Sequence, residues 1–62
     1  MRFYNKQHQF YAGIDLHARN MFVCIIDSNG AIVFHKNMDA DPEHLARAVE
    51  PYKHDIVIGV EC

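Results

Sequence analysis

The sequence lacks the features that mark several common protein classes. Its two cysteines, Cys24 and Cys62, form neither a CxxC pair nor a disulfide framework, which favours a reducing compartment. No apolar run approaches the roughly 18 residues that suggest a membrane span. Residues 1–9 are polar and contain no apolar stretch of the kind found in a signal peptide. We therefore expect a cytoplasmic protein with no membrane partner.

Basic residues are not in excess either. The formal net charge is −2, so the chain has no electrostatic footprint for nucleic acid on its own. The composition is globular, with 50% hydrophobic and 23% charged residues. A chain of 62 residues forms at most one small domain with a modest core.

Apolar segments separated by turn signals predict a sheet of four strands. The segments are rich in β-branched and aromatic residues and span 10–17, 21–27, 31–37 and 56–61. The second and fourth are almost continuously apolar, as in strands that are buried on both faces. The Ser28-Asn29-Gly30 sequence predicts a tight hairpin between the second and third strands, because Asn and Gly tolerate positive φ.

One helix is predicted between the third and fourth strands. Asp41 suits the N-cap, Pro42 fits the first turn, and Pro51 should end or kink the helix. The apolar residues of this segment fall on one helical face: Leu45, Ala48, Val49 and Tyr52.

The order β-β-β-α-β predicts an α/β fold with an antiparallel three-strand meander and a fourth strand parallel to the first. A right-handed crossover then places the carboxyl ends of residues 10–17 and 56–61 at one edge of the sheet. Ligands favour this edge in open sheets that contain parallel strands. The two segments carry Gly13-Ile14-Asp15 and Gly59-Val60-Glu61, so Asp15 and Glu61 should meet there.

The same topology separates the other acids from this pair. Asp27 ends a strand that runs the opposite way and should lie about 20 Å from Asp15. Asp55 precedes the fourth strand and also belongs to the far edge. Asp39 and Asp41 belong to the same edge as Asp15, but capping of the helix accounts for Asp41.

A pair of carboxylates at one edge suggests a site for a hard divalent cation, Mg²⁺ or Mn²⁺. Such metals activate a water or hydroxyl and stabilise the leaving oxygen of a phosphodiester. Asp15 and Glu61 would need further ligands, and the alternative is that they are ordinary strand-end acids facing water. His17 and Arg19 flank the edge and either contact a phosphate or belong to a solvated loop.

The remaining candidate residues favour structural roles. Four other histidines lack metal-ligand spacing and are expected at the surface: His8, His35, His44 and His54. Cys24 should pack within a strand as a small hydrophobe. Near the N-terminus, Arg2 and Lys6 are interleaved with the aromatic residues Phe3, Tyr4, Phe10 and Tyr11. This pattern is compatible with binding a nucleic acid strand or with a simple polar arm.

Three segments resemble the start of an insertion-sequence transposase. They are Tyr-Ala-Gly-Ile-Asp-Leu-His at residues 11–17, the apolar run at 22–27, and Asp-Ile-Val-Ile-Gly-Val-Glu-Cys at 55–62. The family is the IS-one-ten class of DEDD transposases, whose N-terminal domain is RuvC-like with a ribonuclease H fold. The resemblance covers residues 10–62, which would be the N-terminal part of that domain, preceded by the polar arm.

The resemblance implies a role in DNA transposition and recombination. Asp15 matches the first of four metal-binding catalytic acids and Glu61 the second. The last two acids, and a serine of a C-terminal domain, would lie beyond Cys62. The family also implies DNA and a guide RNA as partners, a homo-oligomer, and a bacterial or archaeal cytoplasm. We therefore expect a truncated piece of a longer enzyme that is inactive by itself.

Two alternatives remain open. Actin-like and sugar-kinase ATPases share this strand order and begin with Gly-x-Asp, but they need a glycine-rich turn for phosphate. The turn in this chain is His17-Ala18-Arg19-Asn20, which has no glycine. The other alternative is a non-catalytic module that pairs with a partner through the exposed edge of its fourth strand.

Overall fold

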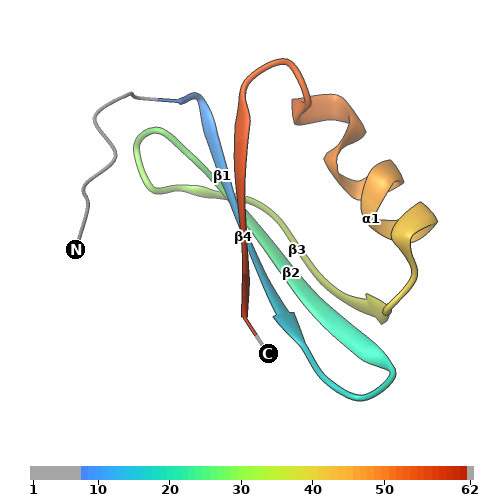
Figure 1. Ribbon diagram of the computed structural model, residues 1–62. Helices are drawn as coiled ribbons and strands as arrows, with labels where there is room; N and C mark the ends of the chain where they lie inside the picture. Colours follow the sequence, from blue (N-terminus) through green and yellow to red (C-terminus); the bar gives the residue numbers. More distant parts are fainter. Residues whose placement is uncertain (1–7, 62) are drawn as a thin grey trace.

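The computed structural model describes residues 8–61 and confirms the β-β-β-α-β order (Figure 1). The elements are β1 (Phe10–Leu16), β2 (Asn20–Asp27), β3 (Ile32–Asp39), α1 (Pro42–Val49), the short 3-10 helix η1 (Glu50–Tyr52) and β4 (Ile56–Glu61). Each strand lies where the sequence predicts it, with small differences at the ends. The polar arm predicted over residues 1–9 lies outside the described residues, except for His8 and Gln9.

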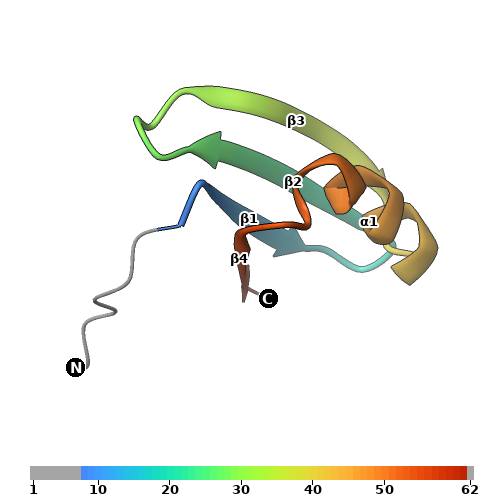
Figure 2. The ribbon, with the colours of Figure 1, turned by 90° about the horizontal axis from the view of Figure 1, so that it is seen from above.

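The four strands form one sheet in the order β3-β2-β1-β4. The pairs β1–β2 and β2–β3 are antiparallel, whereas β4 runs parallel to β1. The predicted meander and parallel fourth strand are therefore confirmed. β1 and β2 lie inside the sheet, and β3 and β4 are its two edge strands (Figure 2).

The hairpin between β2 and β3 depends on Gly30 and Asp27. Gly30 has a φ of 86°, which favours glycine over residues that carry a Cβ. The Asp27 carboxylate accepts hydrogen bonds from the N–H groups of Asn29 at 2.9 Å and Ala31 at 3.0 Å. Asp27 thus stabilises a turn at the end of the strands opposite to the end where Asp15 lies.

The helix begins and ends as its sequence indicates. The Asp41 carboxylate accepts a hydrogen bond of 2.9 Å from the Glu43 N–H and caps α1. The helix ends at Val49, and Pro51 lies in η1. Figure 2 shows α1 on one side of the sheet. Leu45 and Val49 of α1, together with Tyr52 of η1, pack against the core.

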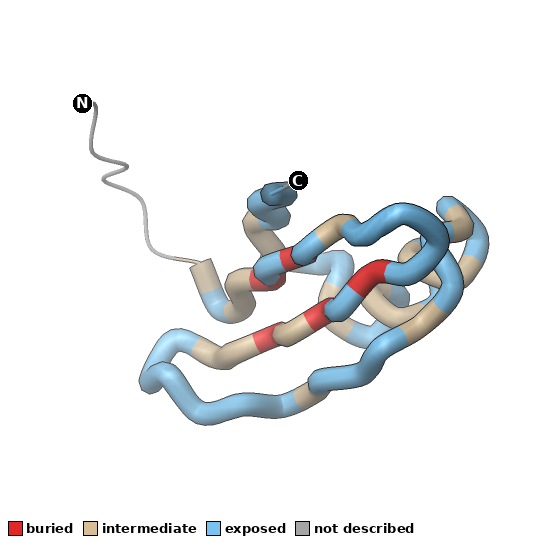
Figure 3. The backbone as a smooth tube through the Cα atoms, turned by 90° about the horizontal axis from the view of Figure 1, so that it is seen from below, coloured by how far each residue is buried: buried red, intermediate tan, exposed pale blue. Residues whose placement is uncertain are grey.

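The core lies between α1 and the two inner strands, β1 and β2. Figure 3 shows the buried segments on two neighbouring strands. Its buried residues come from alternate positions of β1 and β2: Ala12, Ile14, Met21, Val23 and Ile25. The opposite face of the sheet is open within residues 8–61, and Phe22 on that face is 41% exposed. The prediction that β2 is buried on both faces is therefore wrong for the described part of the chain, because one helix covers one face.

β4 also departs from the expected double burial. Ile58 and Val60 pair with core residues of β1, yet they are 43% and 55% exposed. The edge position of β4 explains the difference, because α1 packs over the inner strands and leaves the second half of β4 uncovered.

Candidate metal site

Asp15 and Glu61 stand side by side at the ends of two parallel strands. They are register partners on β1 and β4, so their side chains leave the same face of the sheet. Neighbouring strands lie about 4.8 Å apart, which brings the two carboxylates within reach of one cation. The structure confirms the predicted meeting of these two residues and leaves both exposed to solvent.

The two glycines of the Gly-x-acid segments also face each other. Gly13 is the register partner of Gly59. Each glycine precedes its acid by two residues, so the glycine pair lies next to the acid pair on the same face of the sheet. Neither glycine has a positive φ, and a Cβ added to either would meet no atom within 4 Å. The paired glycines leave the strand backbones bare beside the acids.

A hollow of about 440 Å³ opens above these glycines. Its lining consists of Gly13, Ile14, Asp15, Phe22, Gly59, Val60 and Glu61. The two carboxylates are the charged groups of this lining, and Phe22 forms an aromatic wall. The hollow has room for a hydrated cation together with part of a larger ligand.

His17 is the nearest basic partner of the acid pair. Its Nε2 lies 3.6 Å from Oδ2 of Asp15, and the two side chains are 64% and 56% exposed. A pair this exposed contributes little to stability because water screens it. Asp15 is therefore available to a cation. Arg19 forms no ion pair within residues 8–61, and its carbonyl accepts a hydrogen bond of 2.9 Å from the Ala40 N–H.

Asp15 and Glu61 present two neighbouring carboxylates that could ligate a metal ion. Residues 8–61 contain no group of three or more His, Cys, Asp or Glu side chains that could hold a metal ion. Magnesium often binds proteins through one or two carboxylates and takes water or phosphate oxygens as its other ligands. Asp15 and Glu61 fit that pattern and would leave several coordination positions to other groups.

The other acids lie where the sequence places them. Asp27 pairs with Phe10 at the opposite edge of the sheet, and Asp55 precedes β4 at that same edge. Asp39 lies at the end of β3, at the same end of the strands as Asp15, but β2 stands between β3 and β1. None of these three is a neighbour of the acid pair.

His8 is half-buried and departs in part from the surface position predicted for it. Its side chain is 19% exposed, and its Nδ1 lies 2.5 Å from Oδ1 of Asp55. The contact joins residues 47 positions apart, so the spacing of the histidines along the sequence could not indicate it. His35 and His54 are exposed, as expected, and His44 is half-buried.

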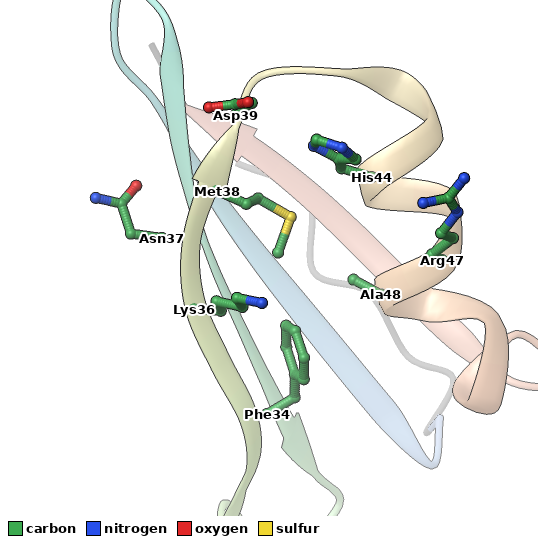
Figure 4. A pocket seen from close by; sticks show the side chains of 8 residues that line it. All are labelled: Phe34, Lys36, Asn37, Met38, Asp39, His44, Arg47 and Ala48. Atoms are coloured by element: carbon green, nitrogen blue, oxygen red, sulfur yellow. The ribbon is translucent and has the colours of Figure 1, made fainter.

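A second hollow, of about 520 Å³, lies between β3 and α1 (Figure 4). Its lining residues are Phe34, Lys36, Asn37, Met38, Asp39, His44, Arg47 and Ala48. Lys36 pairs with the buried Val23, so it lies on the face of the sheet that α1 covers. This hollow is therefore on the face opposite to Asp15 and Glu61. Phe34, Lys36 and Met38 are alternate residues of β3, so a lysine stands between two apolar residues on the face that α1 covers. That lysine is the sequence signal that could have indicated this hollow.

Comparison with known proteins gives no match: no family model, curated protein or solved structure is significantly similar to this chain. Within residues 8–61, no helix has the length and apolar character needed to cross a membrane.

Proposed function

We propose that this chain is the N-terminal part of a DNA transposase or recombinase with a ribonuclease H-like domain. In this proposal Asp15 and Glu61 are catalytic acids that bind Mg²⁺ or Mn²⁺ for phosphodiester chemistry on DNA. The observation that carries it is the register pairing of the two acids at the carboxyl ends of adjacent parallel strands.

The chemistry follows from the charges of the pair. Two carboxylates at close range repel each other unless a cation or a proton lies between them. A divalent metal bound there would activate the attacking water or hydroxyl and stabilise the leaving oxygen of a phosphodiester. Asp15 and Glu61 would hold the cation, and the bare glycines beside them would leave space for the phosphate and its sugar.

The resemblance to IS-one-ten transposases supports the same assignment and extends it. It adds two further acids and a serine outside these residues, a guide RNA, a homo-oligomer and a cytoplasmic location. The 62-residue chain supplies half of the four acids, so we expect it to be inactive alone.

The experiment is a transposition assay on the longest reading frame that contains this chain. Asp15→Asn and Glu61→Gln keep the size of each side chain and remove its charge, so each should abolish transposition while leaving the circular dichroism spectrum unchanged. Asp39→Asn is the matched control, because it removes an acid from the same edge without touching the pair. Wild-type transposition by both the Asp15 and Glu61 variants would refute the proposal.

A non-catalytic pairing module is the second candidate. β4 is an edge strand with exposed apolar side chains, and such an edge is a template for another strand. Sedimentation and thermal unfolding of the 62-residue chain test this function. A monomer that unfolds cooperatively would argue against it.

A further inference from the structure

The side chains of β4 do not by themselves define its register on β1. Residues 56–60 read Ile-Val-Ile-Gly-Val, so a slip of two residues replaces Ile56 by Ile58 and Ile58 by Val60. A two-residue slip also keeps every side chain on its own face of the sheet. Such a slip would move Glu61 about 7 Å along the strand and away from Asp15.

Packing around β4 restrains the strand weakly. Within residues 8–61, β4 makes its extensive contacts with β1 alone. Ile58 and Val60 are about half exposed, so their burial would change little after a slip. The restraint on register must therefore come largely from the start of the strand.

A group of polar contacts joins the start of β4 to the start of β1. We call His8, Gln9, His54 and Asp55 the clasp. The Asp55 carboxylate accepts hydrogen bonds from Nδ1 of His8 at 2.5 Å and from the Gln9 N–H at 3.2 Å. Nε2 of His54 lies 2.9 Å from Oε1 of Gln9. The Phe10 N–H also donates to the Asp55 carbonyl at 3.1 Å.

The side-chain contacts of the clasp are specific to one register. A two-residue slip would put either Lys53 or Val57 where Asp55 now lies. Lys53 carries a positive charge and only donors, and Val57 has no polar side-chain atom. Either slip would leave His8 and the Gln9 N–H without the carboxylate that now accepts from both.

We propose that the clasp sets the register of β4 on β1 and thereby determines that Glu61 stands beside Asp15. His8 and Asp55 are then positioning residues for the acid pair, acting from the opposite edge of the sheet. The inference concerns strand register and holds whether or not the acids bind a metal.

Disulfide trapping measures the register directly. Cysteines at Gly13 and Gly59 report the observed register, because these residues are partners and a Cβ fits at both. Cysteines at Gly13 and Glu61 report a slip in one direction, and cysteines at Asp15 and Gly59 a slip in the other. The pairs are placed in the longest reading frame that contains this chain, with every other cysteine changed to serine. Peptide mapping by mass spectrometry gives the yield of each bridge.

With the clasp intact, the bridge between positions 13 and 59 should dominate. Asp55→Ala should raise the yield of at least one slipped bridge by about tenfold, since hydrogen bonds to a charged group are lost. Lys53→Ala is the control, because Lys53 pairs with Glu50 at 2.7 Å outside the clasp and should leave the register unchanged.

The native bridge alone in the Asp55→Ala protein would overturn the proposal. If that variant fails to fold, and so forms no bridge, His8→Ala decides the question because it keeps the hydrogen bond between Gln9 and Asp55. A slipped bridge in His8→Ala supports the proposal, and the native bridge alone refutes it. These outcomes involve no activity, so they are independent of the transposition assay.

Discussion

Gly13 and Gly59 lie opposite each other on β1 and β4, and neither position requires glycine for its backbone angles or its packing. Glycine inside a strand is less favourable than alanine by roughly 0.5–1 kcal/mol. This pair therefore lowers the stability of the sheet at the point where the candidate metal site opens.

Replacing these strand glycines should stabilise the fold. Gly13→Ala or Gly59→Ala should raise the free energy of unfolding by up to about 1 kcal/mol, measured by urea denaturation. Gly30→Ala is the contrasting variant, because Gly30 has a φ of 86° and alanine there should destabilise the hairpin. Equal losses of stability in all three variants would contradict the assignment of Gly13 and Gly59 as structurally unnecessary glycines.

Loss of the helix cap should weaken α1. Asp41→Ala removes the acceptor for the Glu43 N–H and should lower the free energy of unfolding by about 1 kcal/mol. Asp41→Asn keeps an acceptor oxygen and should lose less. Thermal unfolding followed by circular dichroism compares the two variants, and identical melting temperatures for both and for the parent would exclude a capping role.

The difference in burial between Ile25 and Val60 predicts a large difference in the stability lost when each is replaced by alanine. Ile25 is fully buried, so Ile25→Ala should cost about 2–5 kcal/mol of stability. Val60 is 55% exposed, so Val60→Ala should cost well under half as much, because little burial is lost. Chemical denaturation of both variants checks this order. A larger loss for Val60→Ala would indicate that a partner covers β4.

The clasp should make stability depend on acid pH. The hydrogen bond from His8 holds the pKa of the Asp55 carboxyl below its ordinary value of 3.8. Desolvation raises this pKa, whereas the hydrogen bond from the Gln9 N–H and the charges of His8 and His54 lower it further. A carboxyl whose pKa is lowered by folding stabilises the fold above its unfolded pKa and loses this contribution as the pH falls through the folded value. Stability should therefore decrease below about pH 4.

Asp55→Asn tests this dependence, because the amide cannot ionise. Its unfolding free energy should vary less between pH 5 and pH 2 than that of the parent, as followed by urea denaturation at each pH. His35→Ala, at an exposed position outside the clasp, should retain the parental dependence. Parallel pH curves for Asp55→Asn and the parent would assign the acid sensitivity to other groups.

The 62-residue chain alone should bind Mg²⁺ weakly. Two exposed carboxylates leave most coordination positions to water, so we expect a Kd above about 1 mM by calorimetry. A tight site would show that these residues supply more ligands than Asp15 and Glu61.

The placement of the acids could be predicted from local signals. Asn29 and Gly30 define one hairpin, Asp41 and Pro42 define the helix start, and a right-handed crossover leaves β4 beside β1. These steps place Asp15 next to Glu61 and move Asp27 to the far edge without any knowledge of side-chain packing.

Features that depend on long-range packing could not be predicted in this way. Phe22 stands in the same apolar run as Val23, and only the position of α1 shows that one is exposed and the other buried. The contact between His8 and Asp55 joins residues that lie 47 positions apart, at the starts of β1 and β4. No local sequence pattern around His8 or Asp55 indicates that these two residues are in contact.

The position of β4 in the sheet also affects when the acid pair forms during folding. β1, β2 and β3 can pair through short turns, whereas β4 must close a loop of more than 40 residues before it reaches β1. Contacts so distant in sequence tend to form late. We expect β4 amides to exchange hydrogen faster than those of β2, measurable by mass spectrometry. Asp15 would then gain its partner at the last step, which keeps a partly folded chain from assembling the pair of acids.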